Sequence, residues 1–374
     1  MYFTFDLQMH IKRFIIIFIV SLFPFFSFGQ FSEIYKNGLG IETNLGYGFI
    51  MPHHKAIEYS LEDHISTFDL KLSIPTFGNK YWNQIYRYPY YGVGFYRSNL
   101  GNDDVYGYVN ALYSYVKVPF IGKSNKANLS WQIAFGASYI TKYFDIDDNP
   151  QNLAIGSNLN IYIDFSLQSR IPLSKKLSLM NSVRFTHVSN GKVKSPNKGL
   201  NVISGSIGLL YQFNPTPDRV TLEQPEIENK NEYSLIYAGG VKTKSRYEQG
   251  YYYASSLMFD FNRNYSLKGR WSLGTDIFFD GTSRQFSDNT DQADIINSDL
   301  YQIGLHAGHD LVMGNLALTF NIGGYIYAPV EVLAPIYSRI GLRYRVNNKF
   351  IINYTLKSHW AKASYIEWGI GYIF

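Results

Sequence analysis

Apolar and polar residues alternate along most of this chain, in segments of roughly ten residues. In residues 131–139, Trp, Ile, Phe, Ala and Tyr occupy the odd positions, and Gln, Ala, Gly and Ser occupy the even ones. The same period recurs in residues 159–170, 316–323 and 336–346. A period of two places successive side chains on opposite faces of a β-strand. The pattern therefore predicts amphipathic strands over almost the whole chain.

Strands of this kind fit two architectures. In a soluble β-sandwich the apolar faces meet in a core, whereas in an outer-membrane barrel they face lipid. The strand length and the 33 Tyr and 27 Phe residues, many near strand ends, favour the barrel. The chain also ends in Tyr372-Ile373-Phe374, which resembles the insertion signal of outer-membrane proteins. We therefore expect an all-β, antiparallel transmembrane β-barrel in the cell outer membrane of a Gram-negative bacterium.

The strands fall into two similar halves. The pattern predicts about sixteen strands, eight before Phe213 and eight after Glu232. Residues 214–231 are polar, contain three prolines and lack alternation, so they are predicted to form a linker. The two halves, residues 30–213 and 232–374, end in the similar segments GLLYQF and GIGYIF. Two eight-stranded barrels are slightly favoured over one larger barrel.

The first residues resemble a targeting signal. Lys12 and Arg13 precede an apolar run at residues 14–23, and Ser27-Phe28-Gly29, with small residues at its first and last positions, forms a cleavage site, so residues 1–29 are expected to be a signal peptide. The chain has no cysteine, which excludes a lipoprotein anchor, disulfides and thiolate metal sites. Its net charge of +5 is modest and no basic run occurs, so we expect no nucleic-acid partner.

One strand end carries candidate catalytic chemistry. His187 and Ser189 are two residues apart, so they share a face of the predicted strand 177–189. That face is otherwise apolar and is therefore predicted to face lipid. Asn201 follows fourteen residues after His187 and lies on the outer face of the next strand. Three polar groups thus converge where lipid-facing positions should be apolar, at the end of the barrel predicted to be extracellular.

These residue types suit acyl transfer. His187 would remove the proton from Ser189, Ser189 would attack an ester carbonyl, and Asn201 would orient the imidazole. The plainer interpretation is a polar rim at the end of a strand. The shared face, the returning asparagine and the loop Pro196-Asn197-Lys198-Gly199 together favour a catalytic site.

The stretch from His187 to Asn201 resembles the signature of the outer-membrane lipid A 3-O-deacylases, also called acyloxyacyl hydrolases. The resemblance covers residues 38–213 and implies that lipid A of lipopolysaccharide is the substrate. It also implies that His187 and Ser189 are catalytic and that Asn197 contributes to an oxyanion hole, with Asn190 supporting it. The third catalytic member of that family is a glutamate, where this chain has Asn201.

The asparagine leaves a second enzyme class open. Outer-membrane phospholipase A uses His-x-Ser-Asn-Gly with an asparagine as the third member, a pattern that residues 187–191 and Asn201 match. That enzyme requires calcium, and the chain shows no dedicated ligand cluster, so we expect no metal or cofactor outside this alternative. The Pro-Asn-x-Gly loop favours the deacylase. A third alternative is a catalytically inactive channel or structural barrel.

Other polar residues have less specific roles. Lys192, Lys194 and Lys198 lie in the same loop, where they would either bind the phosphates of lipid A or simply solubilise the loop. His53 and His54 are adjacent loop histidines without carboxylates, a pattern that seldom marks a metal site.

The second half carries no evident active site. Its final hairpin contains His359, but this histidine is predicted to lie with Lys357 and Glu367 on the lumen face, as a polar cluster. Because no serine lies two residues from His359 on its face, the hairpin does not repeat the His-x-Ser arrangement. The sequence leaves the oligomeric state open.

Overall fold

The computed structural model describes residues 35–122, 127–227, 230–247, 250–283, 300–329, 334–360 and 362–374. The predicted signal peptide, residues 1–29, lies outside these ranges. In the described ranges, no helix has both the length and the apolar character needed to cross a bilayer.

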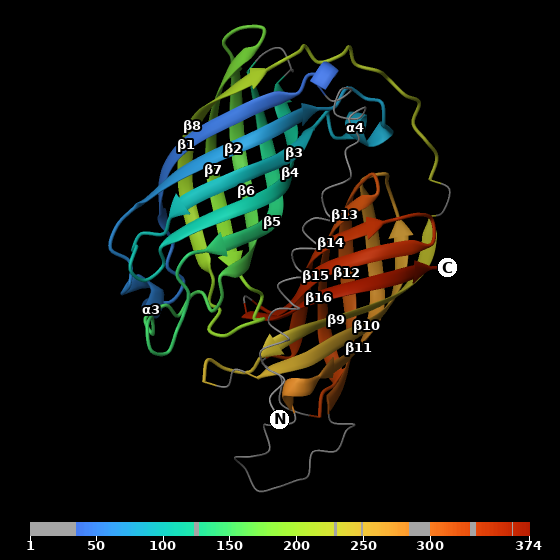
Figure 1. The fold of residues 1–374 in the computed structure, drawn as a ribbon. Coiled ribbons are helices and arrows are strands. Elements are labelled where there is room, and N and C mark those ends of the chain that lie inside the picture. Colours follow the sequence, from blue (N-terminus) through green and yellow to red (C-terminus); the bar gives the residue numbers. More distant parts are fainter. Residues whose placement is uncertain are drawn as a thin grey trace, which may run out of the picture.

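The chain forms two closed antiparallel barrels of eight strands each (Figure 1). The first consists of β1 (Gly40–Ile50), β2 (Ile65–Pro75), β3 (Tyr90–Asn99), β4 (Tyr108–Gly122), β5 (Asn128–Ile140), β6 (Leu159–Pro172), β7 (Leu177–Ser189) and β8 (Leu200–Gln212). The second consists of β9 (Asn231–Thr243), β10 (Tyr251–Asn264), β11 (Gly269–Asp280), β12 (Tyr301–Met313), β13 (Leu316–Tyr327), β14 (Ile336–Arg345), β15 (Phe350–His359) and β16 (Lys362–Ile373). Within each barrel consecutive strands pair, and the last strand closes on the first. The predicted fold, with two barrels rather than one, is confirmed.

The alternating pattern places apolar side chains outside and polar side chains inside each barrel. In β7, Val183 and Phe185 are exposed on the outer surface, whereas Arg184 and Thr186 are buried. An apolar outer surface suits lipid contact, because lipid offers no hydrogen-bond partners.

Ion pairs fill the lumen of the first barrel. Nη1 of Arg184 lies 2.8 Å from Asp69 Oδ2, and its Nε lies 3.0 Å from Asp164 Oδ2. Glu42 accepts hydrogen bonds from Lys71 at 2.6 Å and from Lys117 at 2.7 Å. Each of these buried charges therefore has a partner of opposite sign.

The lumen of the second barrel holds a similar network. Arg339 contacts Glu367 at 2.6 Å, and Arg343 contacts Asp260 at 2.8 Å. His359, Lys357 and Glu367 are all buried inside the barrel, which confirms their predicted lumen face. The Lys357 ammonium lies 3.3 Å from the centre of a phenyl ring, that of Phe278, so aromatic rings contribute to its stabilisation.

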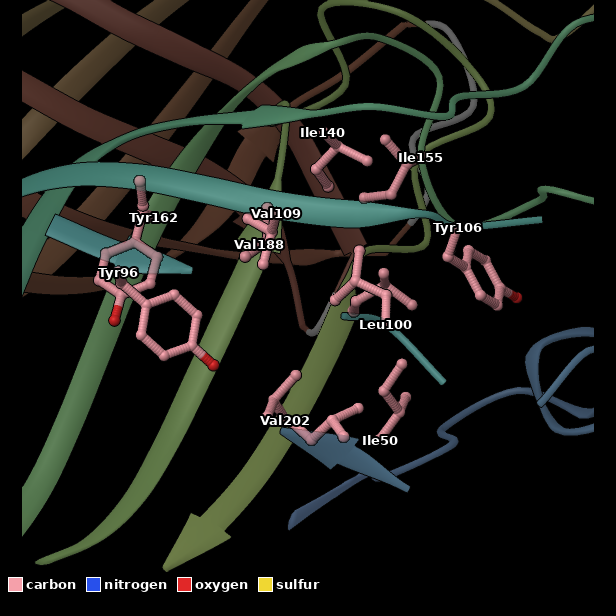
Figure 2. Close-up of a cluster of buried hydrophobic side chains, with 14 of the residues drawn as sticks. Ile50, Tyr96, Leu100, Tyr106, Val109, Ile140, Ile155, Tyr162, Val188 and Val202 are labelled. Carbon is pink, nitrogen blue, oxygen red and sulfur yellow. The ribbon is translucent and has the colours of Figure 1, made fainter. Parts of the chain in front are cut away.

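A buried apolar cluster closes one end of the first barrel (Figure 2). Ile50, Leu100, Tyr106, Ile140 and Ile155 come from strand ends and loops at this end, and Val188 and Val202 come from β7 and β8. Val188 lies between the candidate residues His187 and Ser189 in the chain, and Val202 directly follows Asn201. The cluster therefore anchors both strand ends from the inside, while the candidate residues project outward.

The two barrels lie side by side with their loops at matching ends (Figure 1). At one end Tyr86, which follows α4 (Tyr81–Ile85), donates a hydrogen bond to the carbonyl of Val312 at 2.8 Å. At the other end, which also carries α3 (Lys55–Glu58), the Thr243 N–H donates to the carbonyl of Lys192 at 3.2 Å. Both barrels can therefore span the same bilayer, with the corresponding loops of each barrel on the same side of the membrane.

Candidate active site

His187 and Asn201 face each other across the β7–β8 ladder. They are direct partners in the register of the two antiparallel strands, so their side chains emerge on the same outer face. Nδ1 of His187 lies 2.7 Å from Oδ1 of Asn201. Since an amide oxygen only accepts, Nδ1 carries the proton and Nε2 is left as a base.

Ser189 completes the row on β7. Its Oγ lies 2.9 Å from Nε2 of His187, within hydrogen-bond distance of the nitrogen that can act as a base. Ser189 is buried, whereas His187 and Asn201 are half-buried on the outer surface. The structure thus brings together all three residues that the sequence pattern singled out.

A tight turn leads the chain away from Ser189. Gly191 and Lys192 have φ angles of 62° and 69°, and the N–H of Val193 donates to the carbonyl of Asn190 at 3.3 Å. Positive φ at both central residues defines a type I′ turn, the geometry that suits the twist of a β-hairpin. Gly191 adopts this left-handed conformation without steric cost because it has no Cβ atom.

Asn190 and Asn197 hold the rest of the loop together. The Asn190 side chain donates to the hydroxyl of Ser157 and to the carbonyl of Lys194, both at 2.9 Å. Oδ1 of Asn197 accepts the backbone N–H of Asn190 at 2.9 Å. This bond orients the Asn197 amide with its oxygen toward the Asn190 N–H. The Nδ2 group of Asn197 then points away from that N–H and remains a hydrogen-bond donor.

His53 also reaches the site, although the sequence pattern marked it only as a loop histidine and did not connect it with His187, Ser189 and Asn201. Its Nδ1 lies 3.1 Å from Nδ2 of Asn201, and its Nε2 lies 2.8 Å from the carbonyl of Lys198. His53 comes from the loop that follows β1, almost 150 residues away in sequence from Asn201. Only the closure of β1 onto β8 brings the two together, so no local pattern could reveal the contact.

The three loop lysines have different surroundings. Nζ of Lys198 lies 2.5 Å from Nε2 of His54, and Nζ of Lys194 lies 5.4 Å from the centre of the Tyr143 ring. Burial, together with the nearby Lys242 ammonium, lowers the pKa of Lys192 to about 8. Burial also lowers the pKa of Lys198, with a smaller contribution from Arg246.

The arrangement contains the groups that acyl transfer from a serine requires. A hydroxyl contacts the free nitrogen of an imidazole whose other nitrogen is held by an oxygen, which is the logic of a nucleophile, a base and an orienting group. Within the described parts of the chain, no group of three or more His, Asp or Glu side chains is arranged to hold a metal ion.

Comparison with known families gives a match in each barrel. Residues 66–210 match the lipid A 3-O-deacylase (PagL) family, and residues 231–374 match the acyloxyacyl hydrolase C-terminal domain (PagL_C). The first match includes β7 and most of β8, and so the whole His187, Ser189 and Asn201 arrangement. No curated protein matches the chain.

The chain also resembles solved outer-membrane barrels at low identity. Neisserial surface protein A is 11% identical over 46% of this chain and 96% of its own, with a TM-score of 0.29. The β domain of the Bordetella autotransporter BrkA is 12% identical over 90% of this chain and 98% of its own, with a TM-score of 0.24. The translocator domain of NalP from Neisseria meningitidis is 8% identical over 98% of this chain and 97% of its own, with a TM-score of 0.21.

Proposed function

This chain belongs to the lipid A 3-O-deacylase family of the Gram-negative outer membrane, and we propose that it hydrolyses an acyl ester of lipid A with Ser189 as the nucleophile. Lipid A is the lipid anchor of lipopolysaccharide and lies in the outer leaflet. The site lies on the outer face of the first barrel, at the end that carries the β7–β8 loop. Substrate would therefore arrive laterally from the membrane.

The reaction would begin with a proton transfer. Nε2 of His187 accepts the hydroxyl proton of Ser189 while Oγ bonds to the ester carbonyl carbon, which gives a tetrahedral oxyanion and an imidazolium. The carbonyl re-forms as the bond to the sugar oxygen breaks, and the imidazolium returns its proton to that oxygen. An acyl-serine remains. Water then attacks it with the same imidazole as base, releasing the fatty acid and restoring Ser189.

Asn201 and Asn197 would support different stages. Oδ1 of Asn201 accepts the Nδ1 proton of His187, which keeps Nε2 free as the base and stabilises the imidazolium once it forms. Nδ2 of Asn197 would donate to the oxyanion, while its Oδ1 keeps the amide oriented by accepting the Asn190 N–H. Asn190 would then act by holding the loop.

The loop lysines would bind the anionic part of lipid A. Lys192, Lys194 and Lys198 belong to the loop that carries Asn197, so phosphates bound there would lie beside the scissile ester. The observation that best supports the proposed function is the unbroken series from Ser189 through His187 to Asn201 on a membrane-facing surface.

The proposal is tested by mass spectrometry of lipid A after incubation with the refolded protein. We expect the wild type to release one acyl chain, and Ser189→Ala to release none while still folding. Ser204→Ala is the matched control, since it removes a buried hydroxyl of β8 that has no hydrogen-bond partner in the described structure. Phospholipid is assayed in parallel. Serine-dependent cleavage of phospholipid alone would replace the deacylase with a phospholipase, and no serine-dependent cleavage of either lipid would refute the proposal.

A further inference from the structure

Asparagine can serve as the third member of a serine triad only if its amide is held in one orientation. A carboxylate presents oxygen to the imidazole whichever way it turns, but an amide can turn its NH2 group inward. The imidazole then adopts the wrong tautomer, and in the Ser-His-Asp proteases this change costs roughly 10⁴ in kcat. For Asn201 to serve, something must hold its oxygen toward His187.

His53 is placed to do this. Its Nδ1 lies 3.1 Å from Nδ2 of Asn201, on the side of the amide away from His187. Its Nε2 lies 2.8 Å from the carbonyl of Lys198, which can only accept, so the proton of a neutral His53 is on Nε2. Nδ1 is then an acceptor, and it can be paired only by the NH2 end of Asn201.

Every donor in this series therefore meets an acceptor. The Lys198 carbonyl fixes the tautomer of His53, His53 fixes the orientation of the Asn201 amide, and Asn201 fixes the tautomer of His187. The imidazole of His187 then offers Nε2 to Ser189, 2.9 Å away. Each hydrogen bond has one direction, and the directions of the whole series are set by the backbone carbonyl of Lys198 in the β7–β8 loop.

We propose that His53 is a positioning residue of the active site, which allows a neutral asparagine to stand where the family has a glutamate. This rests on the proposed serine mechanism. His53 touches neither substrate nor nucleophile and acts through the amide of Asn201. A residue with this role should become dispensable once the third member no longer needs orienting.

The test compares His53→Leu in two backgrounds. In the wild-type background we expect kcat to fall about tenfold with KM little changed, the effect of losing one orienting hydrogen bond. In an Asn201→Asp background we expect the same change to alter kcat by less than about twofold, because both carboxylate oxygens accept. His53→Asn should preserve activity, since its amide oxygen can replace Nδ1 as the acceptor. His64→Leu, at another exposed histidine of the same barrel, is the control.

A second readout does not depend on the substrate. Nitrogen-15 NMR of histidine reports which ring nitrogen carries the proton, so it follows the tautomer of His187 directly. We expect the Nδ1–H form in the wild type and a mixture of both forms in His53→Leu. An unchanged tautomer, or an equal loss of kcat in both backgrounds, would overturn the role of His53. Because the NMR readout needs no turnover, its result stays interpretable if lipid A proves not to be the substrate.

A separate observation concerns the second barrel. At the end of β9, Thr243 contacts the catalytic loop through three hydrogen bonds. Its Oγ1 accepts the Ser195 N–H at 2.8 Å and donates to the Ser195 hydroxyl at 2.9 Å, and its own N–H donates to the Lys192 carbonyl at 3.2 Å. Thr243 and Ser195 are both buried.

The second barrel also makes a close contact with the turn that follows Ser189. A Cβ atom at Gly191 would lie 2.5 Å from Cγ1 of Ile366 in β16, so only glycine allows this close approach. On the side of the first barrel, the Asn190 amide donates hydrogen bonds to the Ser157 hydroxyl and to the Lys194 carbonyl. The loop that carries Asn197 is therefore held between the two barrels.

We infer that the second barrel, for which the sequence predicts no active site, keeps the catalytic loop in its working geometry. Thr243→Val removes the hydroxyl at nearly constant shape, and we expect it to lower kcat by about tenfold or more. Thr243→Ser should retain most activity. The control is Thr319→Val, the same change at a buried threonine of the second barrel whose hydroxyl has no partner in the described structure.

Folding is measured separately from catalysis. The shift in electrophoretic mobility on heating reports barrel assembly, and hydrogen exchange of residues 190–197 reports the loop. We expect normal assembly, faster exchange in the loop and a lower kcat in Thr243→Val. If Thr243→Val fails to assemble, Ser195→Ala weakens the same contact from the loop side. A normal kcat in whichever of these variants assembles would overturn the inference.

Discussion

The α-carbon of Gly199 lies directly against the imidazole of His187. A Cβ atom built on Gly199 would be 2.7 Å from Cε1 and 3.2 Å from Nε2 of that ring. The φ angle of Gly199 is +75°, a conformation that other residues rarely adopt. Its N–H also donates to the Ala154 carbonyl at 3.0 Å, so the loop cannot easily retreat from the ring. The glycine of the Pro-Asn-x-Gly loop therefore makes room for His187, the proposed catalytic base.

The first prediction follows from this contact. Gly199→Ala should displace the His187 ring and lower kcat by about 100-fold, the usual cost of misplacing a catalytic group by an ångström. Steady-state kinetics on lipid A measures the effect. Gly205→Ala is the matched control on β8, because a Cβ there would have no neighbour nearer than 4.0 Å. Similar kinetics in the two variants would show that the contact has no catalytic consequence.

Asn197 offers a test of the proposed oxyanion hole. Asn197→Asp keeps the oxygen that accepts the Asn190 N–H but replaces the NH2 group with a second acceptor. We expect kcat to fall by about 10²- to 10³-fold, as when one oxyanion donor is removed. Binding of lipid A should change far less, which equilibrium binding to the Ser189→Ala protein would measure. A loss of binding with normal turnover of bound substrate would place Asn197 in substrate recognition.

Much of the fold was predictable because the barrel repeats one simple rule. Alternation identified the strands, and the same period put His187, Ser189 and Asn201 on one outer face. The structure then showed His187 and Asn201 as direct ladder partners, as expected where the end of one strand and the start of the next lie side by side in a hairpin. A shared face and a hairpin register are local properties, so the sequence contains them.

The contacts that the sequence did not reveal are all long-range. His53 reaches Asn201 only because β1 closes onto β8, and Thr243 reaches Ser195 only because the barrels pack side by side. Neither residue carries a local signal, because a histidine in a loop and a threonine at a strand end are both common. Alternation also defines faces within a strand and says nothing about which outer faces pack together.

The apolar cluster at the loop end gives a prediction about stability. Leu200 is fully buried in this cluster, next to Asn201, so Leu200→Ala should lower the free energy of unfolding by about 2–5 kcal/mol. Leu209→Ala is the control on the same strand, because Leu209 is exposed on the outer surface. Urea unfolding in lipid vesicles, followed by tryptophan fluorescence, compares the two. Equal losses would show that the cluster contributes no more than lipid contact does.

The last prediction concerns the pH dependence of substrate binding. The pKa of Lys192 is lowered to about 8 by burial and by the Lys242 ammonium, so its charge is present below that pH and is lost as the pH rises through it. If Lys192 binds a phosphate of lipid A, KM should rise by about tenfold between neutral and alkaline pH, as a charge-assisted hydrogen bond is lost. Lys192→Met should have a high KM at neutral pH and lose this rise above pH 8.

Lys175→Met, in the turn at the opposite end of the first barrel, controls for the loss of one positive charge. Its KM should follow that of the wild type at every pH. Because phosphate groups themselves keep their charge across this range, a rise in KM that disappears only in Lys192→Met must come from the lysine. A rise that persists in Lys192→Met would assign the phosphate contact to another cation of the loop, with Lys198 as the next to replace.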